Sequence, residues 1–511
     1  MKHLILLLAI VYFQNGFSQE NTKAINIYAD QYISHNYTGN GVQWSAYPHA
    51  DAPDAEWGQM MTEKKWEMVF HRLDYMKPQL VRVMDQANWR YLKGFDKNGE
   101  PILDFNSPEV KTLQKLLDYC QRNDITVLFG EWGCPSQIQS GDSKSSGHFK
   151  GANDPRWIQI IVKYLDFLIN TKGYTCLKYY NLVNEPNGYW ASTNGNWDEW
   201  SEGVKMLQNA LISSGLSKKI SIAGPDVVAE YNNPTSKYTG FEWVAETARQ
   251  LNDYIGIYDI HAYTRYELVR SGNFFKLYSR ISQSAKNVNK PIIFGEIGFD
   301  KSVPENIERI KTDKFASEDS QMSVYDFSYG IDMADVAIQI MSSGYSGAAA
   351  WDLDDAMHTL GDAGDKYKLK RWGFWNSLGT ELCNNPADEN IRPWFYSWSL
   401  ICRYFPNGSN IVKSDSTSME GVRLVAATKN KHLTIALVNN GNKDRKLSFK
   451  VNGGSFSSIA VKKFIYSDNV RPVDGNGFPI PQKTKINFAS KEIIEVEIPA
   501  KSFILFTSLN Y

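Results

Sequence analysis

The sequence predicts an α/β protein: a (β/α)8 barrel of the TIM type, followed by a smaller all-β antiparallel sandwich. Between residues 40 and 404, eight short apolar runs alternate with segments whose apolar residues recur at helical spacing. An open doubly wound sheet would carry a glycine-rich phosphate turn after its first strand, and the sequence has none there. After residue 405 the helical segments give way to short strands separated by turn residues.

The barrel strands are predicted from their apolar runs and from the turn residues that end them. They are residues 41–45, 79–85, 125–129, the run from 177 to Asn184-Glu185-Pro186, and residues 220–224, 254–261, 291–296 and 347–352. Helices are predicted at residues 62–76, from 107, from 154, around 200–211, and at 242–251, 275–288, 326–341 and 392–404. Ser107-Pro108 and Asp154-Pro155 are typical helix starts, because a capping side chain is followed by proline.

The C-terminal strands are predicted at residues 422–427, 433–438, 447–451, 459–465, 493–498 and 503–507. Asn440-Gly441 and Gly453-Gly454 supply turns between some of them. We therefore expect a barrel domain over residues 20–404 and a sandwich over 405–511. Residues 24–29 alternate between apolar and polar, so they could add a strand to the sandwich.

The chain begins with the features of a secretory signal. A charged start is followed by apolar residues 4–13, too few to span a bilayer, and then by the small residues Gly16 and Ser18. We expect residues 1–19 to be removed and the protein to be exported, to the periplasm or the medium. Other apolar runs are too short to cross a membrane, so insertion is not expected.

Composition excludes several classes of partner. The 55 Lys and Arg against 56 Asp and Glu leave a net charge of −1, which provides no basic field for nucleic acid. The five cysteines are odd in number and lack paired spacing, so neither a disulfide framework nor a zinc site is indicated. We expect no metal, no cofactor and a monomer. The 15 Trp and 28 Tyr would suit stacking on the apolar faces of sugars.

Side chains at the carboxyl ends of barrel strands share one face of the barrel, where active sites are built. The predicted strand ends place nine candidate residues on that face: Arg82, Glu131, Trp132, Asn184, Glu185, His261, Tyr263, Glu296 and Trp351. Glycoside cleavage needs an acid to protonate the leaving oxygen and a carboxylate or water on the other face of the sugar. Two glutamates on facing strands meet that requirement.

The barrel half resembles glycoside hydrolase clan A, the retaining barrel enzymes with Asn-Glu after strand four and Glu after strand seven. By this resemblance, Glu185 is the acid/base and Glu296 the nucleophile of a retaining β-glycosidase that degrades oligo- or polysaccharides. The other strand-end residues would bind substrate. The resemblance also implies carboxyl groups roughly 5 to 5.5 Å apart. Gly130-Glu131-Trp132 stands where cellulase-like members often carry histidine, so no individual family is assigned.

Some positions have two interpretations. Arg82 either orients Glu296 or balances Asp85, and Glu131 either contacts substrate or pairs structurally. Asp352, Asp354 and Asp355 form an acidic cluster, which we interpret as a solvated loop rather than a calcium site. The tryptophans at 190, 197, 200, 372 and 375 include candidates for binding subsites, with Trp200 assigned to a buried helix face. Two long polar segments, 133–153 and 301–323, would shape the walls of the site.

Two other functions remain open. A barrel that has lost catalysis would act as a carbohydrate-binding protein, although both glutamates are present. A metal-dependent barrel hydrolase would need clustered His and Asp ligands, which the sequence does not show as a motif.

Overall fold

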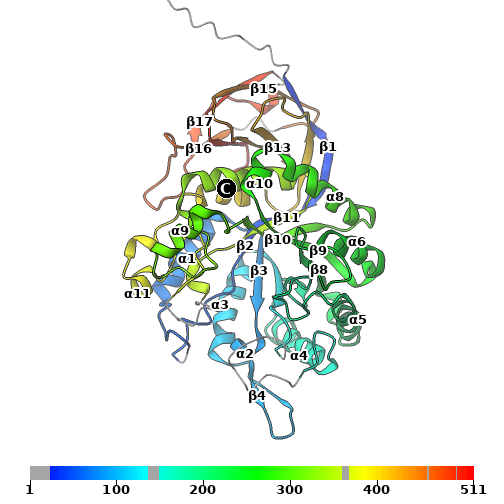
Figure 1. The fold of residues 1–511 in the computed structure, drawn as a ribbon. Coiled ribbons are helices and arrows are strands. Elements are labelled where there is room, and N and C mark those ends of the chain that lie inside the picture. Colours follow the sequence, from blue (N-terminus) through cyan, green and yellow to red (C-terminus); the bar gives the residue numbers. More distant parts are fainter. Residues whose placement is uncertain (1–23, 54, 136–148, 359–367, 457–459, 491) are drawn as a thin grey trace, which may run out of the picture.

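The larger part of the chain forms a closed barrel of eight parallel strands with helices around it (Figure 1). The computed structural model describes residues 24–511 except 54, 136–148, 359–367, 457–459 and 491. The barrel strands are β2 (Gly39–Gln43), β3 (Leu80–Asp85), β6 (Thr126–Glu131), β7 (Leu177–Asn181), β8 (Ser221–Val228), β9 (Ile255–Thr264), β10 (Ile292–Phe299) and β11 (Gly347–Ala350). They neighbour one another in chain order, and β11 pairs with β2 to close the barrel. The predicted fold class is confirmed.

Helices surround the barrel, one or more after each strand (Figure 1). The longer helices are α1 (Glu63–Met76), α3 (Pro108–Arg122), α4 (Pro155–Asp166), α5 (Trp197–Ser213), α6 (Gly240–Gln250), α8 (Asn273–Asn287), α10 (Phe327–Ser342) and α12 (Phe395–Tyr404). The two predicted helix starts are capped as expected: Ser107 accepts from the Val110 amide and Asp154 from that of Arg156. The other helices are the short α2 (Ala87–Arg90), α7 (Tyr266–Arg270), α9 (Pro304–Thr312) and α11 (Gly379–Cys383).

The two long polar segments predicted from the sequence, 133–153 and 301–323, differ in what the structure describes of them. The segment 301–323 is not a plain loop, because Pro304 begins the helix α9 within it. Most of the other predicted loop, residues 136–148, lies outside the described residues, as does the predicted signal at 1–19. A two-stranded hairpin, β4 (Leu92–Phe95) with β5 (Pro101–Leu103), follows α2 and was not predicted.

The C-terminal strands form one nine-stranded sheet that curls around its own apolar core. Its members are β1 (Ile25–Tyr37), β12 (Ser409–Ser414), β13 (Val422–Lys429), β14 (His432–Asn439), β15 (Arg445–Asn452), β16 (Lys462–Ser467), β17 (Gln482–Lys483), β18 (Ile494–Ile498) and β19 (Ser502–Thr507). The N-terminal strand β1 pairs antiparallel with β12 and parallel with β15. Register shifts in the pairing of β1 with β12 bend the long strand β1. One edge of β1 pairs with β12 and the other with β15, so β1 joins the strands on its two sides into one sheet.

Six small or aliphatic side chains fill the inside of the barrel below the candidate site: Leu80, Leu128, Ala223, Ile257, Ile293 and Ala349. Because side chains alternate along a strand, residues two positions further along also point inward. Arg82 follows Leu80 in this way, and His261 follows Ile257 by two such steps. The packed layer thus supports the polar residues above it.

Two findings concern cysteines and helices. All five cysteines are buried. Among the described residues, no helix combines the length and apolar character that crossing a bilayer requires.

Candidate active site

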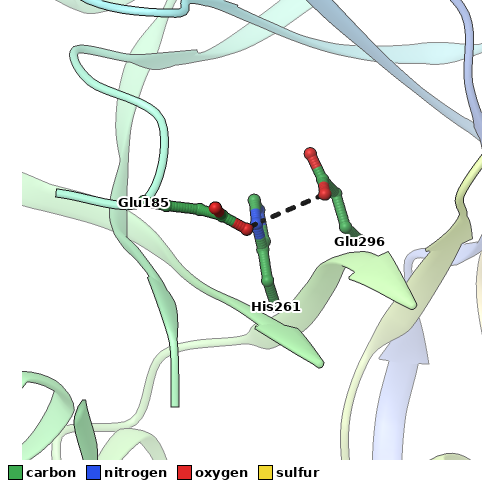
Figure 2. A group of neighbouring side chains, drawn as sticks. All are labelled: Glu185, His261 and Glu296. Atoms are coloured by element: carbon green, nitrogen blue, oxygen red, sulfur yellow. Dashed lines mark hydrogen bonds and ion pairs between the residues drawn. The ribbon is translucent and has the colours of Figure 1, made fainter. Parts of the chain in front are cut away.

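Glu185 and Glu296 face each other across the carboxyl end of the barrel, with His261 between them (Figure 2). One carboxylate oxygen of each glutamate and one ring nitrogen of His261 all lie within 4.8 Å of one another. Both glutamates are largely buried, at 8% and 2% exposed. The two strand ends chosen from the sequence therefore meet in space.

The inward position of Glu296 depends on an irregularity in β10. Ile293 points into the barrel, so strict alternation would turn Glu296 outward. The pairing of β10 with β9 shifts register between Phe294 and Glu296, and its pairing with β11 shifts nearby. Such a bulge re-aims the following side chain, and here it directs the carboxylate into the site.

Glu296 receives two strong hydrogen bonds. Arg82 donates from Nη1 to Oε1 at 2.5 Å, and the Tyr263 hydroxyl donates to Oε2. Arg82 is fully buried, and its Nη2 also donates to Asn184 Oδ1 at 2.7 Å. Asp85 pairs instead with Arg90, at 2.5 Å, so Arg82 contacts Glu296 rather than Asp85. A cation and a phenol together stabilise a carboxylate at this position.

Glu185 has a different set of partners. It lies in the loop after β7, where its φ of +48° is in the left-handed region, and its amide donates to the Asp226 carbonyl at 3.1 Å. Oε1 lies 2.9 Å from His261 Nδ1, and Oε2 accepts from Trp190 Nε1 at 2.5 Å. The two glutamates thus occupy distinct environments, as an acid and a nucleophile of one residue type require.

Asp226 is the central residue that the sequence prediction missed. The predicted fifth strand stopped at Gly224, but β8 continues to Val228, with a register shift between Pro225 and Val227. This shift, with a φ of +61° at Asp226, accompanies a carboxylate that points into the barrel. Asp226 accepts from Arg82 Nη2 at 3.0 Å and from Asn181 at 2.6 Å.

Asp226 also sets the charge of His261, whose Nε2 lies 3.0 Å from Asp226 Oδ1. Burial alone would lower the pKa of His261, but Glu296 and Asp226 raise it well above its ordinary value. Burial alone would raise the pKa of Asp226, yet Arg82 and His261 hold it at about 2. His261 is therefore a buried imidazolium that bridges Asp226 and Glu185.

We expect Asp226→Asn to lower kcat/KM by roughly ten- to a hundredfold, the equivalent of losing about 1.4 to 2.7 kcal/mol of charged hydrogen bonding. The substitution removes one of the two charges that raise the pKa of His261, while Glu296 keeps the other, so this ring would lose its proton at a lower pH than in the wild type. Steady-state kinetics and the imidazole nuclear magnetic resonance of His261 measure the two effects.

Asp259→Asn is the matched control. Burial and the charge of Asp226 raise the pKa of Asp259 well above its usual range, which favours the neutral carboxyl that an asparagine resembles. Its Oδ1 accepts from the Gly295 amide at 2.6 Å, a bond that an asparagine oxygen preserves. Equal losses in the two variants would contradict a specific role for the Asp226 charge.

Aromatic residues lie at the carboxyl ends of β6, β9 and β11, on the same face of the barrel as the glutamates. Trp351, 5% exposed, packs edge-on against Trp132 at a centroid distance of 6.1 Å. Tyr263 packs against Trp372 at 5.4 Å. Of the other tryptophans considered, Trp190 is exposed, whereas those at 197, 200 and 375 are core residues. Sugar binding by Trp132, Tyr263, Trp351 and Asn184 remains a prediction.

Glu131 lies in a separate buried cluster. Its Oε1 accepts from the Tyr91 hydroxyl at 2.7 Å, and burial followed by the charge of Asp85 raises its pKa well above the usual range. Among the described residues, none of its hydrogen bonds reaches Glu185 or Glu296. This placement favours the structural interpretation of Glu131 over contact with substrate.

The interpretation of the acidic cluster as a solvated loop is wrong. Asp352, Asp354 and Asp355 are all fully buried. Asp354 accepts from Tyr47 at 2.7 Å, among other donors, and Asp355 pairs with Arg392. Since Asp354 and Asp355 have hydrogen-bonding or charged partners inside the protein, they fix the chain after β11 instead of facing solvent.

Two largely enclosed histidines, His49 and His358, couple stability to pH. Burial, and then nearby positive charge, lowers the pKa of both His49 and His358 to about 3. His358 stacks on Trp351 at 5.2 Å and lies 2.9 Å from Asp352, whose own pKa burial raises well above its usual range. In the folded state both imidazoles are therefore neutral near pH 5.

We expect the free energy of unfolding to fall as pH decreases from about 6.5 towards 3, because only the unfolded chain takes up these protons. The slope is about 1.4 kcal/mol per pH unit for each histidine. Denaturant unfolding at a series of pH values would measure it. His358→Gln and His49→Gln should each reduce the slope, and an unchanged slope in both would contradict this origin.

Two groups of side chains are close enough to offer ligands to a cation: Glu185 with His261 and Glu296, and Asp226 with Asp259 and His261. The sequence-based reason against a metal, that clustered ligands are lacking, is therefore wrong for the folded chain. The donors are already engaged, however. Arg82 donates to both Glu296 and Asp226, and the His261 imidazolium has both nitrogens occupied. These two cations oppose the binding of a third.

Comparison with known proteins bears on the fold. No family model and no curated protein sequence matches the chain. Its structure is similar to a glycoside hydrolase family 30 subfamily 8 xylanase from Clostridium acetobutylicum (15% identity, 95% of this chain and 99% of that one, TM-score 0.61). It is also similar to a family 39 β-xylosidase from Caulobacter crescentus (11% identity, 96% of this chain and 100% of that one, TM-score 0.58). A third similar structure is a family 51 α-L-arabinofuranosidase from Bifidobacterium longum (12% identity, 96% of this chain and 100% of that one, TM-score 0.62). At the level of the fold, the chain therefore shares the architecture of solved glycoside hydrolases of families 30, 39 and 51.

Proposed function

We infer that the protein is a retaining β-glycoside hydrolase that cleaves oligo- or polysaccharides through two glutamates. One observation carries this proposal: carboxylate oxygens from the ends of β7 and β10 lie within 4.8 Å of each other. Retaining enzymes hold their carboxyl groups about 5 to 5.5 Å apart, whereas inverting enzymes need about 6.5 to 9.5 Å to admit a water. The shared fold with solved glycoside hydrolases supports the same reaction class.

In the first step, Glu296 attacks the anomeric carbon while Glu185 gives its proton to the departing oxygen. A covalent glycosyl-enzyme forms on Glu296, and the leaving group departs with the proton. In the second step, Glu185 removes a proton from water, which attacks the same carbon and releases Glu296. Two inversions give net retention.

The other polar residues have roles that follow from their contacts. Arg82 and Tyr263 hold the Glu296 carboxylate in one orientation for attack. His261 orients Glu185 and is itself held by Asp226. Asn184 is fixed by Arg82 and has its amide group next to Glu185 in the chain, where it would bind a sugar hydroxyl.

The sugar and its place of action belong to the same proposal. The structurally similar proteins are described as a xylanase, a β-xylosidase and an arabinofuranosidase, so xylose- and arabinose-containing glycosides come first in a screen. Export of a monomer through the signal at 1–19 fits a substrate that occurs outside the cell.

A screen of nitrophenyl glycosides and polysaccharides, followed by proton nuclear magnetic resonance of the first-formed product, tests the proposal. We expect turnover on at least one glycoside and a product with the configuration of the substrate. A product of inverted configuration would overturn the role of Glu296 as nucleophile. Sugar binding by calorimetry without any turnover would instead support a carbohydrate-binding barrel.

A further inference from the structure

Three aromatic side chains beside Glu185, those of Tyr189, Trp190 and Tyr231, form a cluster that we name the aromatic platform. The ring centroids of Tyr189 and Trp190 are 5.0 Å apart, and those of Trp190 and Tyr231 are 4.7 Å apart. Tyr189 is 69% exposed and Trp190 46%. Single exposed apolar residues are ordinary, but contiguous aromatic surface in a soluble protein marks a binding surface.

The platform is held in place by the loops that carry it. The side chain of Asn187, in the loop after β7, donates to the carbonyls of Val228 and Tyr231 at 3.0 and 3.1 Å and accepts from the Val228 amide at 3.2 Å. These bonds tie the β7 loop to the β8 loop. A methyl group on Gly188 would lie 2.4 Å from the indole of Trp190, so the ring rests directly on the glycine. These hydrogen bonds and this contact hold the three rings in place before a flat partner binds.

The position of the platform relative to Glu185 identifies that partner. Trp190 Nε1 donates to Glu185 Oε2, so the platform adjoins the acid/base, whereas Arg82 and Tyr263 surround Glu296. The oxygen that Glu185 protonates must come within about 2.6 to 3.2 Å of its carboxyl. Whatever is attached to that oxygen therefore lies alongside Glu185, next to the three rings.

We propose that the aromatic platform binds the sugar ring on the leaving-group side of the scissile bond. A pyranose has an apolar face of C–H groups that stacks on large rigid rings, and these give contact area at low entropic cost. This inference rests on the proposed glycosidase function. It implies that the substrate is a saccharide chain whose leaving group is itself a sugar, not a small alcohol.

The experiment compares two substrates that share a glycone. Xylohexaose leaves a sugar on the platform side, whereas β-xylobiosyl fluoride leaves only fluoride; β-1,6-linked glucohexaose and β-gentiobiosyl fluoride form a second pair. In the double variant Tyr189→Ala/Tyr231→Ala, the Trp190 hydrogen bond to Glu185 is retained. We expect the ratio of kcat/KM on the hexaose to that on the fluoride to fall about tenfold. Tyr32→Ala, an exposed ring on β1 of the C-terminal sheet, is the control and keeps the wild-type ratio.

The outcomes separate the two proposals. If the wild type cleaves both members of a pair and the double variant keeps the ratio, the platform does not bind the leaving group, and the glycosidase function stands. If the wild type cleaves none of the four substrates and no glycoside in the screen, the function fails and the platform with it. Gly188→Ala, which displaces the indole while keeping all three rings, should lower the same ratio, and an unchanged ratio there contradicts the stacked geometry.

Discussion

Glu296→Ala is expected to lower hydrolysis by a factor of roughly 10⁴ to 10⁶, because the residue that forms the covalent intermediate is gone. Arg82 keeps Asp226 and Asn184 as partners, so the buried guanidinium is not left alone and the fold should persist. Steady-state rates, with circular dichroism to confirm folding, measure the loss. Undiminished turnover would refute the two-glutamate mechanism.

Added azide makes the Glu296→Ala test more specific. The shortened side chain leaves room for a small anion on the face of the sugar that the carboxylate occupied. With Glu185 still present as acid, azide should displace an activated leaving group in one step and give a glycosyl azide of inverted configuration. Glu131→Gln is the control, since burial raises the pKa of the Glu131 carboxyl, which favours the neutral form that glutamine resembles, and the Tyr91 hydroxyl donates to it. We expect near-wild-type rates for this variant, and a large loss would place Glu131 in substrate binding after all.

The sequence predicted the barrel because its strands are short apolar runs and the segments between them carry apolar residues at helical spacing. It also predicted the two glutamates, since the strand that ends at Asn184-Glu185-Pro186 is fourth and the one that holds Glu296 is seventh. The shared face follows from counting and from the rule that barrel strands end on one face, whereas the pairing of these two glutamates follows from the resemblance to glycoside hydrolase clan A. The distances between side chains required the structure.

What escaped prediction depends on backbone irregularity and on tertiary charge pairing. Asp226 follows a Gly-Pro that reads as the end of a strand, but β8 passes through it with a register shift. Asp355 appears in the sequence as part of a solvated acidic run, yet Arg392, 37 residues later in the chain, pairs with it in the interior. Glu296 was predicted at the site, but the register shift in β10 that turns its side chain inward was not. Bulges and buried ion pairs are set by the packing of the whole barrel, so local patterns do not reveal them.

Glu185→Ala is expected to give a loss that depends on the leaving group, unlike Glu296→Ala. For sugar or other poor leaving groups, the missing proton should reduce the rate by roughly 10² to 10⁴. For a dinitrophenyl or fluoride leaving group, which departs without a proton, the first step should remain fast and the glycosyl-enzyme on Glu296 should accumulate. A burst of released phenol in stopped-flow measurements would detect it.

Azide also distinguishes the two glutamates by the stereochemistry of the product. In Glu185→Ala, the anion takes the place of the acid/base and attacks the glycosyl-enzyme, so the second inversion still occurs and the glycosyl azide has the configuration of the substrate. Trp190→Phe is the matched control, because it removes the hydrogen bond to Glu185 Oε2 but keeps the carboxyl; added azide should give no glycosyl azide with this variant. If Glu185→Ala yielded an inverted azide, or if Glu296→Ala yielded a retained one, the two roles would have to be exchanged. Opposite configurations from two residues that share His261 would show that the barrel holds one carboxylate on each face of the sugar, which is the geometry that retention requires.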